Sequence, residues 1–220
     1  RVLCTTYPVY LLTTAVTEGV DGVQVDLLVQ GQISCLHDYT LTVNDMKAIE
    51  AADVIVMNGV GLEDFMSNAL SQSAASVIDC AQGLELLPYE GHEEHDHGAG
   101  EEEGEHYDPH IWMDPERADQ MVRNIGAGLA DADPEQAEQY MENAQTAGFT
   151  LCNLKMVLRE CIASDQSDLQ LPHRELITFH DGFRYFAQAL GLPLLASIEE
   201  EEGSEASAKE INEITGLVKE

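Results

Sequence analysis

Short runs of apolar and β-branched residues alternate along the chain with segments whose apolar residues recur at helical spacing. The short runs predict strands over residues 2–6, 23–29, 54–57, 77–79, 175–179 and 194–197. The periodic segments predict helices over residues 9–17, 44–52, 62–70, 115–129, 134–162, 183–190 and 207–219. Because strands and helices alternate, we expect an α/β fold with a mostly parallel sheet and helices on both faces.

Residues that favour helix starts precede three of these helices. Thr42 and Asp45 have the spacing of a capping box. Asp114 and Asp133 each precede a proline, a pattern that places an N-cap aspartate before a proline in the first helical turn. These signals support the predicted starts.

The helix predicted from residue 134 is much longer than the others. Thirty residues would span about 45 Å, a length typical of a helix that links two lobes. We therefore expect an N-terminal lobe over 1–132, a linking helix over 133–163 and a partial C-terminal lobe over 164–220. Two predicted strands are too few for a stable sheet in that second lobe, so we expect further chain to complete it.

Residues 90–107 interrupt the pattern with acids, glycines and histidines. A segment with so few apolar residues cannot bury itself, and it predicts a mobile loop. Its histidines are His92, His95, His97 and His106. Two interpretations carry equal weight: these side chains capture Zn²⁺ weakly and pass it inward, or the segment is a solvated insertion.

Charge along the chain is strongly unbalanced. The 220 residues include 41 acidic and only 10 basic side chains, for a formal net charge of −31. A phosphate backbone would repel such a surface, so nucleic acid is not an expected partner. Metal cations would be attracted to it, although acidity can equally serve solubility alone. No apolar run is long enough to span a bilayer. The sequence starts at Arg1, directly before a predicted strand, so we expect that a signal peptide was removed or the chain was trimmed.

The five cysteines do not form a zinc-binding pattern. None of them belongs to a CxxC motif, which argues against a cysteine-based zinc site. Their odd number leaves at least one thiol unpaired. If Cys152 and Cys161 share the long helix, they lie roughly 13 Å apart, which is too far for a disulfide.

Three other histidines, His37, His110 and His180, lie at junctions between predicted elements. His180 directly follows a predicted strand, at the edge of the sheet where α/β proteins bind ligands. Neutral imidazoles are good zinc ligands, and three of them leave one coordination position open. A single histidine is more often a surface or helix-capping residue, and these three match no local zinc motif. Their spacing alone is therefore weak evidence for a site.

Five segments, in the same order along the chain, resemble the zinc- and manganese-binding receptors of ABC metal importers. They are HDY at 37–39, ADVIVMNGVGLE at 52–63, DPHIWMDP at 108–115, FHDGFRYF at 179–186 and EASA at 205–208. The third and fourth are specific signals of that family, and the five spread over nearly the whole chain. The resemblance implies two lobes, each a mostly parallel sheet flanked by helices, joined by one rigid helix.

The resemblance also implies the metal site. One Zn²⁺ is expected between the lobes, held by His37 and His110 of the first lobe and His180 of the second. Manganese receptors of this family usually have a carboxylate at the third position, so a histidine there favours Zn²⁺ over Mn²⁺. Carboxylates suited to orient these imidazoles are Asp38, Asp108 and Asp181.

The function implied is capture of Zn²⁺ without any enzymatic reaction. We expect a monomer that delivers the ion to the membrane permease of an ABC importer, which an ATPase drives. The expected location is extracytoplasmic, either as a cell-surface lipoprotein or in the periplasm.

The fourth ligand is open, because the family often supplies a late aspartate and this chain ends before it. Water, a carboxylate beyond Glu220 and a local acid are the candidates. Two other functions also stand as alternatives. One is a zinc hydrolase that uses the three histidines, although the chain has no HExxH motif. The other is a manganese receptor or an adhesin of the same family.

Overall fold

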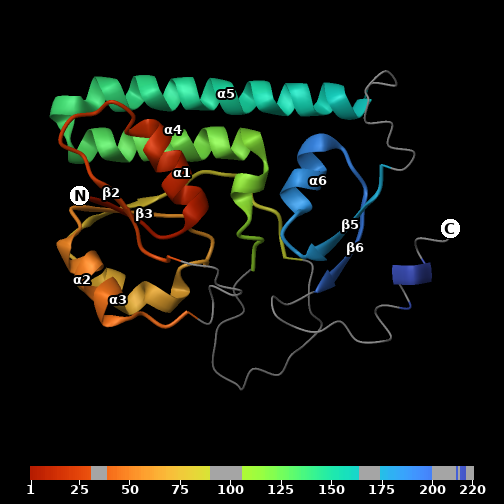
Figure 1. Cartoon of the computed structure of the whole chain (residues 1–220), viewed down its shortest axis with the longest axis horizontal. Coiled ribbons are helices and arrows are strands. Elements are labelled where there is room, and N and C mark those ends of the chain that lie inside the picture. The colour runs from red at the N-terminus through yellow and green to blue at the C-terminus, as the bar shows by residue number, and fades with distance from the viewer. Residues whose placement is uncertain (31–38, 90–105, 164–173, 200–211, 213, 217–220) are drawn as a thin grey trace.

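The computed structural model describes residues 1–30, 39–89, 106–163, 174–199, 212 and 214–216. Its larger sheet contains four parallel strands in the order β2-β1-β3-β4 (Figure 1). The strands are β1 (Val2–Cys4), β2 (Val25–Leu27), β3 (Val54–Met57) and β4 (Ser76–Asp79). Val2 of β1 lies opposite Val25 on one side and Val54 on the other. The expected parallel sheet is confirmed.

Helices cover both faces of this sheet, also as expected (Figure 1). One face carries α1 (Tyr7–Val16), α4 (Pro115–Ala132) and α5 (Ala137–Ala163), and the other carries α2 (Val43–Ala51) and α3 (Ser67–Gln72). Alternate residues of each central strand point to opposite faces. Within β1, Cys4 packs in the core under α1, α4 and α5, whereas Leu3 packs in the core over α2 and α3. Strands that are apolar on both faces are typical of such a covered parallel sheet.

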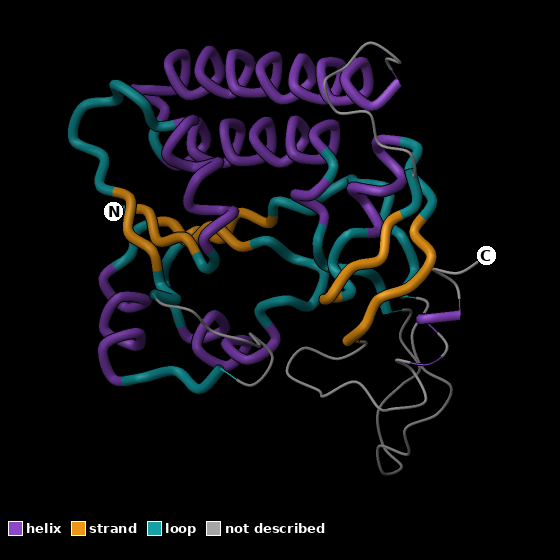
Figure 2. The backbone as a smooth tube through the Cα atoms, turned by 45° about the vertical axis from the view of Figure 1, so that its right-hand side comes forward, coloured by secondary structure: helices purple, strands orange, loops and turns teal. Residues whose placement is uncertain are grey.

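The two longest helices, α4 and α5, run side by side (Figures 1 and 2). Asp114 caps α4 as predicted, since its carboxylate accepts a hydrogen bond from the backbone N–H of Glu116 at 3.0 Å. Lys155 of α5 reaches this helix start and lies 3.2 Å from Asp114 Oδ1 and 2.7 Å from Glu116 Oε2. The ion pairs therefore fix α5 to the start of α4. In the described part of the chain, no helix is both long and apolar enough to cross a membrane.

The predicted long helix is confirmed, with a difference at its start. α5 contains 27 residues, which corresponds to about 40 Å. Asp133 occupies the predicted N-cap position before a proline, but it caps a 3₁₀ turn, η3 (Pro134–Gln136), that precedes α5, and its side chain makes no cap bond there. Its carboxylate instead accepts a hydrogen bond from the Tyr140 hydroxyl at 3.1 Å, while its N–H closes α4 on Leu129.

A second sheet lies beside the first, beneath the C-terminal half of α5 (Figures 1 and 2). It consists of the parallel strands β5 (Leu176–His180) and β6 (Leu194–Glu199), connected by α6 (Arg184–Leu190). Gly191 ends α6 in the left-handed conformation, with φ of 68°. The helix expected over 207–219 falls largely outside the described residues, although 212 and 214–216 are helical.

Four of the five cysteines lie in the described residues, and their thiols are free. Cys4 and Cys80 are buried in the core, whereas Cys152 and Cys161 are exposed on α5. Burial raises the pKa of Cys4 to about 12, so this thiol stays protonated. Cys35 lies outside the described residues.

Candidate metal-binding site

His110 is held by the segment that leads into α4. The backbone N–H of Asp108 donates to the Leu87 carbonyl at 2.9 Å, and a β-bridge joins Pro88 to Tyr107. After His110 the chain forms a 3₁₀ turn, η2 (Ile111–Met113), and then α4. The histidine is therefore fixed on both sides by regular structure.

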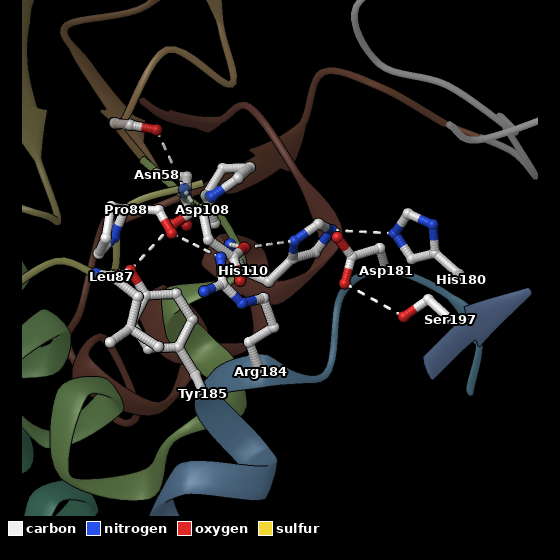
Figure 3. Close-up of polar contacts among 12 residues, drawn as sticks. Asn58, Leu87, Pro88, Asp108, His110, His180, Asp181, Arg184, Tyr185 and Ser197 are labelled. Carbon is white, nitrogen blue, oxygen red and sulfur yellow. Dashed lines mark hydrogen bonds and ion pairs between the residues drawn. The ribbon is translucent and has the colours of Figure 1, made fainter. Parts of the chain in front are cut away.

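The buried carboxylate of Asp108 determines the orientation of the His110 ring. Its Oδ1 accepts from the backbone N–H of His110 at 2.9 Å and lies 2.7 Å from His110 Nδ1 (Figure 3). Since an ionised carboxylate can only accept, Nδ1 carries a proton, and in the neutral imidazole Nε2 then keeps a lone pair for a metal ion. The other oxygen of Asp108 is buried without a partner among the described residues. A cation bound at Nε2 would compensate this buried negative charge through the ring.

His180 ends β5 and points toward His110 (Figure 3). The two Nε2 atoms lie 3.1 Å apart, and the ring centroids are separated by 5.0 Å. Two nitrogen ligands of a tetrahedral zinc ion, each about 2.05 Å from the metal, lie about 3.3 Å from one another. The two imidazoles thus have nearly the separation that a shared zinc ion requires.

Gly182 leaves room for this pair of rings. A Cβ atom at this position would lie 2.8 Å from His180 Cδ2 and 3.0 Å from His110 Nε2. Contacts below 3.0 Å would force one of the rings to move. A glycine is therefore needed at the third position of the motif His180-Asp181-Gly182, because any side chain there would crowd the two imidazoles.

The motif Asn58-Gly59-Val60-Gly61-Leu62-Glu63 supports the same loop from behind. The Asn58 amide donates to the Pro109 carbonyl at 2.9 Å, immediately before His110. Glu63 in turn fixes this turn, because its carboxylate accepts from the backbone N–H of Asn58 at 2.7 Å and of Gly59 at 3.0 Å. Gly59 has φ of 85°, and a Cβ there would collide with Asp79. The motif is visible in the sequence, but the roles of Asn58 and Glu63, like that of Gly182, emerge only from these contacts.

The structure places only some of the predicted site residues. His37, Asp38, His92, His95 and His97 lie outside the described residues. His106 is exposed, and its carbonyl accepts from the Tyr89 N–H at 2.8 Å. The Asp181 carboxylate accepts from the Ser197 hydroxyl at 3.2 Å, whereas His180 Nδ1 has no partner in the described structure. Across the ranges that the structure describes, no group of three His, Cys, Asp or Glu side chains could hold a metal, so His110 and His180 stand as a pair.

Known proteins resemble most or all of this chain. A putative metal-binding protein of Treponema pallidum is 33% identical over 161 residues, which cover 71% of this chain and 49% of the relative. The high-affinity zinc uptake system protein ZnuA of Bacillus subtilis is 32% identical over 216 residues, which cover 94% of this chain and 64% of the relative. The crystal structure of ZnuA superimposes with a TM-score of 0.81 at 29% identity and covers all of this chain and 78% of the known one.

The chain spans about half the length of the first of these relatives. The family described as zinc-uptake complex component A, periplasmic (ZnuA), matches residues 2–220. Since this match covers nearly every residue, the chain belongs to the family of periplasmic zinc-uptake components A.

Proposed function

We propose that this chain captures Zn²⁺ outside the cytoplasm and delivers it to an ABC permease. His110 and His180 would bind the ion through their Nε2 atoms, and His37 would supply a third nitrogen. The observation that carries the proposal is the 3.1 Å separation of the two Nε2 atoms, with Asp108 fixing the tautomer of His110. The similarity to the high-affinity zinc uptake system protein of Bacillus subtilis also supports Zn²⁺ as the ion.

Zinc fits these ligands better than manganese does. Imidazole nitrogen suits Zn²⁺, whereas Mn²⁺ prefers carboxylate, carbonyl and water oxygens. Both facing ligands at the described site are imidazoles, and the carboxylate of Asp108 contacts a ring nitrogen instead of the space between the rings. We therefore propose Zn²⁺ as the cargo and leave Mn²⁺ as the weaker ligand.

The proposal includes the organisation of the chain and its partners. Residues 1–132 would form the first lobe, 133–163 the linking helix, and 164–220 part of the second lobe. The receptor would act as a monomer, with no catalytic step. Its partners would be the permease and the ATPase of an importer, at the cell surface as a lipoprotein or in the periplasm.

Zinc titration against a chromophoric chelator tests this proposal. The wild-type chain should bind one Zn²⁺ tightly, and His110→Ala, His180→Ala and His37→Ala should each lose most of that affinity. His106→Ala is the matched control, because this exposed histidine is not a proposed ligand of the tight site. Tighter binding of Mn²⁺ than of Zn²⁺ would overturn the choice of metal.

Turnover assays separate a receptor from a zinc hydrolase. The metal-loaded chain should leave ester, peptide and phosphoester substrates intact. Hydrolysis that disappears in His180→Ala would contradict the receptor and favour the enzyme.

The histidines His92, His95, His97 and His106 form a separate proposal, which is weak capture of Zn²⁺ before transfer to the main site. Deletion of residues 91–106 tests it. The rate of zinc transfer should fall while the tight site keeps its stoichiometry of one. An unchanged rate would favour a solvated insertion.

A further inference from the structure

Tyr185 belongs to α6, in the same segment as His180, yet its side chain is buried in the core of the larger sheet. It is 0% exposed and packs in the cluster that contains Ile111 and Met121. The Arg117 guanidinium of α4 lies over its ring, 4.6 Å from the centroid. The part of the chain that carries His180 is therefore inserted into the core that supports His110.

The hydroxyl of Tyr185 bridges the two backbone segments, at Leu87 and at Asp108, that hold the His110 loop. It donates to the Asp108 carbonyl at 2.9 Å and accepts from the Leu87 N–H at 3.0 Å (Figure 3). Asp108 is the residue that orients the His110 ring, and its own N–H bonds to Leu87. Burial raises the pKa of Tyr185, so the hydroxyl keeps the proton that it donates.

The residue before Tyr185 strengthens the same contact. Arg184 donates to the Pro88 carbonyl at 2.5 Å. The start of α6 therefore holds Leu87 through a part-buried hydrogen bond and Pro88 through an exposed one. Three residues, Asp181, Gly182 and Phe183, separate His180 from Arg184, the first residue of α6.

We propose that Tyr185 is a positioning residue of the metal site, which locks the His110 loop to the segment that carries His180. The two Nε2 atoms then face each other before any metal binds. This inference rests on the proposed function, because it takes the histidine pair as the zinc site. Tyr185 does not touch the ion; it acts through Asp108, whose carbonyl it holds and whose carboxylate holds His110.

The chain contains a matched control for this hydroxyl. Tyr140 is 1% exposed in the same core, and its hydroxyl also donates one hydrogen bond, to Asp133 Oδ2 at 3.1 Å. It lies at the far end of the fold from the histidines, near the start of α5. Tyr140→Phe therefore removes a buried tyrosine hydroxyl without touching the His110 loop.

The experiment compares Tyr185→Phe with Tyr140→Phe by amide hydrogen exchange of the metal-free protein and by zinc affinity. In Tyr185→Phe, exchange of the Leu87, Asp108 and His110 amides should rise about three- to tenfold, and zinc affinity should fall by the same factor, which corresponds to one lost hydrogen bond. Tyr140→Phe should change neither quantity. Arg184→Gln provides a second variant at a more accessible position, and it should raise exchange of the same amides by a smaller factor.

The outcomes separate this inference from the proposed function. Unchanged exchange in Tyr185→Phe, or the same change of the loop in Tyr140→Phe, would overturn the positioning role. If Tyr185→Phe does not fold, unchanged exchange of these amides in Arg184→Gln would overturn it, and faster exchange would support it. Faster exchange in a chain that binds no zinc would support the positioning role and refute the proposed cargo.

Discussion

His110 Nε2 and His180 Nε2 lie 3.1 Å apart, although 70 residues separate the two histidines along the chain. One comes from the loop before α4 and the other from the end of β5 in the smaller sheet. Asp108 orients the first ring, and Gly182 leaves space for both. The pair is therefore built from two distant segments of the chain, and each contact can be removed separately.

Asp108→Asn should weaken zinc binding without removing a ligand. Asparagine loses the negative charge that stabilises a metal-bound imidazole, and substitutions of such orienting carboxylates typically lower metal affinity by about 10- to 100-fold. The measurement is competition with a chelator of known affinity, at a pH well above the histidine range.

Asp181→Asn is the matched control for that experiment. The carboxylate of Asp181 accepts from the Ser197 hydroxyl instead of from an imidazole. We expect its affinity for Zn²⁺ to change by less than about threefold, the effect of a partly exposed hydrogen bond. Equal losses in both variants would show that net negative charge, and not orientation of His110, sets the affinity.

Gly182→Ala should separate the two rings. The added Cβ would lie 2.8 Å from His180 Cδ2 and 3.0 Å from His110 Cδ2, so at least one imidazole must move. A shift of this kind distorts tetrahedral coordination, and we expect a loss of zinc affinity of about tenfold or more. Gly216→Ala is the control, because a Cβ there meets nothing within 4 Å. Unchanged affinity in Gly182→Ala would contradict the steric argument.

Glu63 should make stability depend on pH in a defined direction. Burial raises its pKa above 4.5, against the hydrogen bonds from Thr5, Asn58 and Gly59, which lower it. The folded state therefore binds this proton more tightly than the unfolded state does. The resulting stabilisation is complete below pH 4.5 and is lost as the pH rises through the raised folded-state pKa.

The test compares the wild type with Glu63→Gln, which cannot ionise. The free energy of unfolding of the variant, relative to the wild type, should increase as the pH rises above 4.5. Urea unfolding of the metal-free proteins across this range measures the difference, in which the contributions of all other groups cancel. A difference that falls with pH would mean that the hydrogen bonds outweigh burial.

Most of the fold follows from local patterns in the sequence. The strand over 54–57 and the capping box at Thr42 agree with the structure, because strand periodicity and capping depend on neighbouring residues alone. The side-chain bond expected of Asp133 is absent for a different reason. Its carboxylate accepts from the hydroxyl of Tyr140, seven residues along the chain, a partner that the pattern of an aspartate before a proline does not reveal.

The site was less predictable than the fold. Histidine positions at element junctions suggested His110 and His180, but their 3.1 Å approach depends on how the two sheets pack. Asn58 and Tyr185 act through single hydrogen bonds to backbone carbonyls of Pro109 and Asp108. Such contacts leave no periodic or compositional signal, so only the three-dimensional structure identifies them.

The decisive test of the proposed zinc site is a crystal structure of the zinc-loaded chain, with anomalous data collected on both sides of the zinc edge. We expect one strong anomalous peak between His110 and His180, about 2.0–2.1 Å from each Nε2 atom. We also expect His37 to supply a third ligand to this ion. A peak elsewhere, with the space between the two Nε2 atoms empty, would refute the proposed site.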